Sequence, residues 1–169
     1  MADPVNFRHT IPAGGAGQPL SSMCWHASYK MMLAWAKDDT TDIQARLTAA
    51  GLKWDELTAR GLYREEFVRA GHALGFMGLG VDAIRRYTHA DLADRLKLWG
   101  PFWTGIDPGG VGSPTHAVVT SGVDERLDRV YYMDPYKRPY DGDADAGCWT
   151  LKQFQKLLTD TPFCVQIWP

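Results

Sequence analysis

The strongest constraint on the fold is a change of pattern at Gly100. Before this residue, apolar side chains recur every three or four positions, as on one face of a helix. After it, short runs rich in β-branched and aromatic residues alternate with polar turns. Helices first and strands afterwards is the α+β pattern. We therefore predict one domain over 1–169, with an arm (1–17), a helical lobe (18–99) and an antiparallel β lobe (100–169), and a cleft between the lobes.

Four helices are expected in the first half. The first is apolar on most sides, which is typical of a buried central helix. It is expected to begin near Ser21 or Ser22, because either hydroxyl can accept an N–H of the first turn. We expect 52–61 to form a loop. The other three helices, with their expected caps, are 42–51 (Thr41 or Asp42), 63–76, and 89–100 (Thr88 or His89).

Four apolar runs in the second half predict strands, and one segment predicts a short helix capped by Thr150. The two central runs flank the polar turn 124–128 and indicate a hairpin. Residues 137–149 are expected to form a polar loop. The strands are expected at 101–106, 116–123, 129–136 and 163–168, and the helix at 151–158.

Composition and charge exclude several classes of partner. The net charge is -2 and no basic run is present, which argues against nucleic acid. No uncharged apolar stretch approaches the roughly 20 residues that cross a bilayer, so no membrane partner is expected. The start, MADPVNFRHT, lacks the apolar core of a signal peptide. We expect a protein that is cytoplasmic as made or exported by a dedicated machine, or a domain of a longer chain.

The cysteines and acidic residues do not suggest a metal or cofactor. Three cysteines without a CxxC pair argue against a zinc site or a disulfide scaffold. Cys148 and Cys164 are expected to be isolated buried thiols, with a disulfide between them as the alternative. The segment DGDADAG (141–147) is similar to a calcium loop but lacks the glutamate at its twelfth position. We therefore expect no metal and no cofactor.

Cys24 is the candidate nucleophile because it lies in the expected first turn of the apolar helix. The N-terminus of a helix carries partial positive charge, which favours the reactive thiolate. The alternative is a buried structural cysteine. A nucleophilic cysteine also needs an imidazole that protonates the leaving group, so the histidines decide between these readings.

Of the five histidines, His116 has the most suggestive position. It begins an expected strand directly after a glycine-rich loop, where a strand end can face a cleft. His26 is only two residues from Cys24 and would point about 200° away from it on a helix. The remaining three are expected in the arm or on helix surfaces, namely His9, His72 and His89.

Hairpin geometry indicates a partner for His116. If 124–128 is the turn, His116 and Asp134 are opposite or diagonal neighbours on adjacent antiparallel strands, within reach of each other. A slip of one residue would turn one of the two to the other face. A carboxylate beside an imidazole fixes its tautomer and stabilises its charged form. The alternative is that Asp134 is only a turn residue.

Gln18, six positions before Cys24, is the candidate oxyanion donor. Acyl transfer needs hydrogen-bond donors aimed at the developing oxyanion. The side-chain amide of Gln18 and the backbone N–H of Cys24 would supply two. A glutamine alone carries no signal, so this assignment depends on the other three residues.

Together these residues resemble the papain-like cysteine peptidases. The chain has Q-x5-C-W at a helix start, H-A-V-V at a strand start and a carboxylate on the next strand, in the order of that clan. The resemblance runs from Gln18 to about Trp168. It is greatest to compact bacterial branches, the AvrRpt2-like effector peptidases and the bacteriocin-processing peptidases of ABC transporters, because Asp134 precedes a proline. Ser22 and Met23 depart from papain, which has a glycine and a serine near its cysteine.

The resemblance implies a papain-like two-lobed fold and a cysteine peptidase that acts on a protein or peptide. It implies that Cys24 is the nucleophile, His116 the general acid and base, Asp134 its orienting partner and Gln18 the oxyanion donor. With only 17 residues before Gln18, control is expected from folding on delivery or from a cognate inhibitor or immunity protein. A monomeric bacterial effector or toxin is the expected setting. The alternatives are a peptidoglycan amidase, a deamidase or a transglutaminase with the same triad, and a binding module with a dead site.

Overall fold

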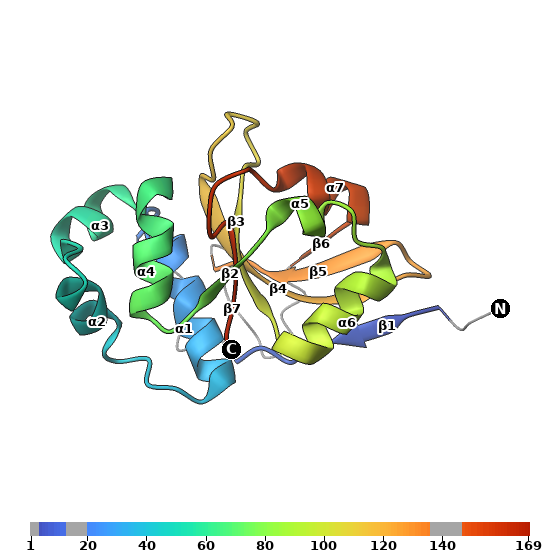
Figure 1. Cartoon of the computed structure of the whole chain (residues 1–169), viewed down its shortest axis with the longest axis horizontal. Coiled ribbons are helices and arrows are strands. Elements are labelled where there is room, and N and C mark those ends of the chain that lie inside the picture. The colour runs from blue at the N-terminus through green and yellow to red at the C-terminus, as the bar shows by residue number, and fades with distance from the viewer. Residues whose placement is uncertain (1–3, 13–19, 136–146) are drawn as a thin grey trace.

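A computed structural model of the chain describes residues 4–12, 20–135 and 147–169. Within these ranges, seven α-helices accompany a seven-stranded antiparallel sheet (Figure 1). Four helices and one 3-10 turn form the group on the left of Figure 1, and α1 lies between the other three and the sheet. These elements are α1 (Cys24–Ala36), α2 (Ile43–Ala49), α3 (Trp54–Arg60), the 3-10 turn (Arg64–Glu66) and α4 (Phe67–Ala73).

The sheet has the strand order β2-β7-β3-β4-β5-β6. The seventh strand, β1, lies outside this linear order and pairs antiparallel with β4. Its strands are β1 (Asn6–Arg8), β2 (Met77–Leu79), β3 (Phe102–Ile106), β4 (His116–Asp124), β5 (Arg129–Met133), β6 (Gly147–Trp149) and β7 (Val165–Ile167). The remaining helices are α5 (Val81–Ile84), α6 (His89–Trp99) and α7 (Leu151–Leu157). The α+β class is confirmed, but β1 and β2 come from the first half of the chain, where no strand is predicted. The end of the predicted loop at 137–149 is the strand β6, which pairs with β5.

Apolar side chains are buried on both faces of the sheet. On the face toward α1, Leu33 packs with Trp103 of β3 and Val119 of β4. On the opposite face, Phe154 of α7 packs with Val123 of β4. Each such side chain stabilises the fold by roughly 1.5–3 kcal/mol relative to an exposed position. The central strands β3 and β4 are therefore fixed from both sides, and both border the site.

Two helix starts agree with the sequence and two do not. One of the two that do not is α2, where Asp42 stands at the N-cap but its side chain makes no capping hydrogen bond. Thr88 and Thr150 cap α6 and α7 through capping boxes, as predicted. The helix α1, however, begins at Cys24, and Met23 at its N-cap makes no capping hydrogen bond. The hydroxyl of Ser22 donates instead to the carbonyl of Thr58, at 2.5 Å.

The segment expected as a loop at 52–61 contains α3. Its only buried residue is Leu57, so it has no apolar stripe that would signal a helix. Its charges are arranged as in a helix, with Asp55 and Glu56 in the first turn and Arg60 in the last, where they complement the helix dipole. This arrangement of charges was the sequence signal that could have predicted a helix at 54–60.

A bulge in β4 sets the position of the hairpin residues that matter for the site. Near the turn Val123 pairs with Val130, but beyond Ser121 the register shifts by one residue and Val119 pairs with Met133. Continuing this register places Asp134 diagonal to His116 on the same face of the sheet. Without the extra residue the two side chains would lie on opposite faces. The bulge therefore brings the imidazole and the carboxylate together.

Candidate active site

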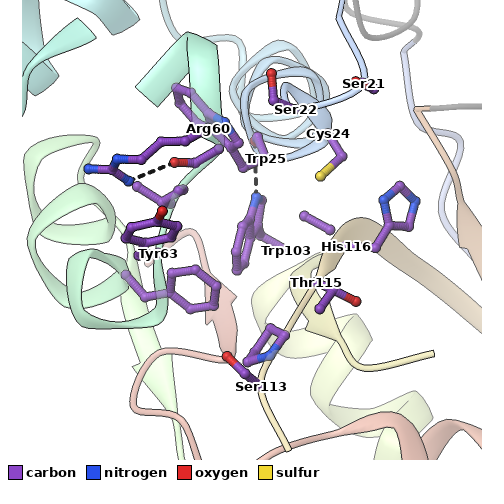
Figure 2. Close-up of a pocket in the computed structure, with 15 residues that line it drawn as sticks. Ser21, Ser22, Cys24, Trp25, Arg60, Tyr63, Trp103, Ser113, Thr115 and His116 are labelled. Carbon is purple, nitrogen blue, oxygen red and sulfur yellow. Dashed lines mark hydrogen bonds between the residues drawn. The ribbon is translucent and has the colours of Figure 1, made fainter. Parts of the chain in front are cut away.

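The thiol of Cys24 lies at the first residue of α1 and borders a cleft of about 370 Å³. The cleft is lined by the start of α1, by residues 60–63 at the end of α3 and just after it, by α4 and β3, and by the segment that leads into β4. Figure 2 shows the side chains of Cys24 and His116 next to each other at the edge of this space, and the two interact. Cys24 is only 9% exposed, so the sulfur is shielded on most sides.

His116 is bonded to Asp134 as the hairpin geometry predicts. Its Nε2 lies 2.8 Å from Oδ1 of Asp134, and the two side chains are 22% and 16% exposed. Because Nε2 is engaged by the carboxylate, Nδ1 remains for the thiol. Burial lowers the pKa of His116, but hydrogen bonds to Asp134 and Cys24, and the charges of both, outweigh it and raise this pKa to about 9. The imidazole is therefore protonated at neutral pH.

The other histidines are engaged elsewhere. His26 stacks edge-on against Trp25 and Trp54, and burial and the nearby Lys30 lower its pKa to about 4. His9, His72 and His89 contact the carbonyl of Leu96, the ring of Phe163 and the carboxylate of Asp128, respectively. None of them lines the cleft around Cys24.

The cleft wall opposite His116 is largely apolar. Leu62, Phe67 and Trp103 line this wall. Among the described residues, Arg60 and His116 are the only basic side chains that line the cleft as a whole. Arg60 donates to both carboxylate oxygens of Glu66, at 2.9 and 2.8 Å, and its guanidinium lies 4.0 Å from the centre of the Tyr63 ring. The charge of Arg60 is thus already paired.

The segment before β4 is more ordered than its glycines suggest. The buried carboxylate of Asp107 accepts the backbone N–H groups of Val111 and Gly112, at 3.1 and 2.6 Å. This holds the turn that leads to Ser113 and Thr115 in the cleft wall. The sequence predicts only a flexible loop here. An aspartate before a Pro-Gly-Gly run is a signal for such a turn, since its side chain bonds local backbone groups.

Several predicted features lie apart from this cleft or outside the described residues. Gln18 falls outside the described ranges, and so does most of the segment 141–147. All three cysteines are free, so the alternative disulfide between Cys148 and Cys164 is excluded, and Cys148 is exposed rather than buried. In the described part of the chain, no cluster of potential metal ligands occurs, and no helix has the length and apolar character needed to cross a membrane.

The fold is that of a papain-like cysteine hydrolase. A helix that begins with a cysteine faces a histidine at the start of a strand in an antiparallel sheet. The sequence model of the papain-like cysteine protease AvrRpt2 family matches residues 6–159, and the chain belongs to this family. The membership confirms the predicted resemblance, the papain-like fold and the assignment to the cysteine peptidases. No curated protein matches the sequence significantly.

Proposed function

We propose that the protein hydrolyses peptide bonds with Cys24 as nucleophile, His116 as general acid and base, and Asp134 as its orienting partner. The observation that carries the proposal is the position of His116 between a thiol and a carboxylate, which raises its pKa to about 9. An imidazolium beside the sulfur favours the thiolate, which is the attacking form. Peptide hydrolysis is preferred to other amide chemistry because the family is one of proteases.

In this mechanism the Cys24 sulfur attacks the carbonyl carbon of the scissile bond, and the electron pair moves to the carbonyl oxygen. The C–N bond then breaks, and the amine leaves with the proton from Nδ1 of His116. Water next gives a proton to the neutral imidazole, and its oxygen attacks the thioester. The C–S bond breaks and restores the thiolate and the imidazolium. Asp134 keeps the ring oriented throughout and stabilises its charged form.

The oxyanion site follows from the start of α1. The first hydrogen bond of the helix runs from the Ala27 N–H to the Met23 carbonyl, so the N–H groups before Ala27 have no partner within the helix. Such groups bind anions. The Cys24 N–H is therefore proposed as one oxyanion donor, and Gln18 as the second on the basis of the family resemblance.

Substitution of the nucleophile tests this function. Cys24→Ala should reduce hydrolysis of unfolded casein to background, because no thioester can form. Cys148→Ala removes an exposed thiol that does not line the cleft, and should retain wild-type turnover. A cleavage-site profile of a whole proteome, wild type against Cys24→Ala, would then define the substrate. Wild-type activity in Cys24→Ala would contradict the proposal.

Two further assays address the other classes of function. Peptidoglycan digestion with no cleavage of any protein would favour an amidase. A cysteine-directed epoxide that forms no adduct at Cys24 would favour a binding module. We propose further that the substrate is a protein and that the enzyme is a bacterial effector or toxin. Its activity would then be controlled by a cognate inhibitor.

A further inference from the structure

The thiol and the imidazole come from two elements whose separation must be fixed. Ser28 lies one helical turn after Cys24, and residues four apart lie on the same side of a helix. Ser28 is completely buried, and its hydroxyl donates to the carbonyl of Ala117, at 3.1 Å. Ala117 directly follows His116 in β4. This hydrogen bond therefore links the helix of the nucleophile to the strand of the imidazole.

The strand pairing explains why this carbonyl is available. On one side, Ala117 pairs with Gly105, but the Gly105 N–H is directed to the Cys164 carbonyl, at 2.7 Å, away from β4. On the other side, continuing the β4–β5 register places Pro135 opposite Ala117. A proline has no N–H to donate. The Ser28 hydroxyl supplies the donor that the sheet lacks at this position.

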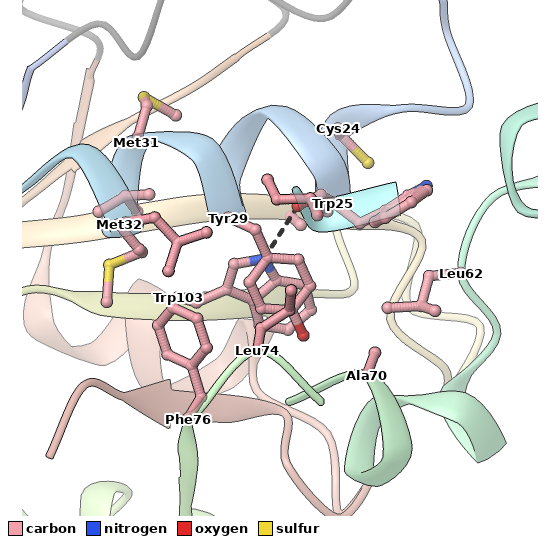
Figure 3. Close-up of a cluster of buried hydrophobic side chains, with 14 of the residues drawn as sticks. Cys24, Trp25, Tyr29, Met31, Met32, Leu62, Ala70, Leu74, Phe76 and Trp103 are labelled. Atoms are coloured by element: carbon pink, nitrogen blue, oxygen red, sulfur yellow. Dashed lines mark hydrogen bonds between the residues drawn. The ribbon is translucent and has the colours of Figure 1, made fainter. Parts of the chain in front are cut away.

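A second contact holds the first turn of the same helix. The indole Nε1 of Trp103 donates to the Trp25 carbonyl, at 3.2 Å, and Figure 3 shows this bond beneath the start of α1. The Trp103 ring is stacked on that of Tyr29, with centres 4.9 Å apart. Trp103 belongs to β3, however, so this contact ties α1 to the sheet without touching the residues beside His116.

We propose that Ser28 is a positioning residue that fixes the separation between the Cys24 thiol and the His116 imidazole. The inference rests on the proposed function, because it concerns the same thiol–imidazole pair. Ser28 itself does not line the cleft. Its effect on the chemistry passes through the backbone of Ala117 and through the helix.

The test measures alkylation by iodoacetamide, because thiol reactivity reports the thiol–imidazole pair without any substrate. The rates at Cys24 and at exposed Cys148 are followed by mass spectrometry from pH 5 to 10 in the same sample. Ser28→Ala should slow Cys24 relative to Cys148 by about 10-fold at pH 6, because the thiolate loses its imidazolium partner. The pH profile of Cys24 should move toward that of Cys148. Thermal melting followed by circular dichroism establishes that both proteins are folded.

Thr104→Val is the matched control. Thr104 is also completely buried, and its hydroxyl is bonded to that of Thr120 across β3 and β4, at 2.9 Å. This substitution should lower the melting temperature and leave the Cys24 profile unchanged. If the ratio of the Cys24 to the Cys148 alkylation rate in Ser28→Ala stays within 2-fold of the wild-type ratio, the inference is overturned. Equal slowing of Cys24 in Thr104→Val would also overturn it. Casein hydrolysis by Cys24→Ala judges the proposed function separately, since it does not depend on Ser28.

Discussion

Two histidines lie near Cys24, one in the sequence and the other in the folded structure, and their surroundings differ. His26 is adjacent in sequence and packs among tryptophans, with ring centres 5.6 Å from Trp25 and 5.3 Å from Trp54. Its buried Nδ1 has no hydrogen-bond partner in the described part of the chain. Burial and the positive charge of Lys30 both oppose protonation, and the pKa of His26 falls to about 4.

His116 is remote in sequence and reaches the sulfur across the cleft. Burial opposes its protonation too, but Asp134 and Cys24 supply hydrogen bonds and negative charge, and the pKa of His116 rises to about 9. The comparison shows that burial alone does not determine the state of an imidazole in this protein. Its anionic partners do, and these are brought together by the fold rather than by sequence proximity.

The largest expected effect separates the two histidines directly. His116→Ala should lower kcat/KM by about 10²–10⁴-fold, because the leaving amine loses its proton donor. His26→Ala should change kcat/KM by less than about 2-fold, since this ring does not line the cleft. Steady-state hydrolysis of casein, corrected for the folded fraction, measures both. Equal losses in the two variants would remove the distinction between the two sites.

A smaller effect is expected at the carboxylate. Asp134→Ala should lower kcat/KM by about 10–100-fold, less than loss of the imidazole itself. In the wild type, activity should fall above about pH 9, where His116 loses its proton. Removal of Asp134 takes away interactions that raise this pKa, so the basic limb of the pH profile should move to lower pH.

The control for this effect is a second histidine–aspartate pair. Asp128→Ala removes the carboxylate that lies 3.1 Å from Nε2 of His89, away from the cleft. It should leave the pH profile unchanged. A basic limb that stays near pH 9 in Asp134→Ala would show that the carboxylate does not hold the charge on His116.

The smallest effect concerns stability rather than rate. The folded state lowers the pKa of His26 from 6.5 to about 4, so between these pH values the unfolded chain binds more protons than the folded one. The stability contributed by His26 should therefore be lost as pH falls through this window, by about 2 kcal/mol at pH 5. His26→Phe should flatten the dependence of the free energy of unfolding on pH between 4 and 6.5. Urea titrations at several pH values would measure it, and an unchanged slope would contradict the assignment.

Local patterns predicted the regular parts of the fold. The caps at Thr88 and Thr150 and the strands β3, β4, β5 and β7 follow from periodicity and turn chemistry. The three missed strands, β1, β2 and β6, are each three residues long, too short for a periodic signal. Each is defined by its partner strand, β4 for β1, β7 for β2 and β5 for β6. Pairings between such separate segments cannot be predicted from the local pattern of a single sequence.

The closeness of His116 and Asp134 was predicted from the length of the hairpin, but the bulge that brings both side chains to the same face was not. At Gly122, next to the bulge, an added Cβ would lie 2.6 Å from the Phe7 carbonyl oxygen, because β1 pairs closely with β4 there. The irregular register thus occurs where three strands meet. The hydrogen bond from Ser28 was invisible too, since it depends on a backbone carbonyl that only the folded chain presents, whereas the turn held by Asp107 had a signal in the Pro-Gly-Gly run that follows it.

The uncapped start of α1 limits which substitutions at Met23 can be favourable. A serine or aspartate in place of Met23 would typically stabilise a helix by about 1 kcal/mol, by accepting an N–H of the first turn. That acceptor would compete with the oxyanion of the proposed mechanism for the same donors. Selection for a more stable helix and selection for a faster enzyme therefore act in opposite directions at this one residue.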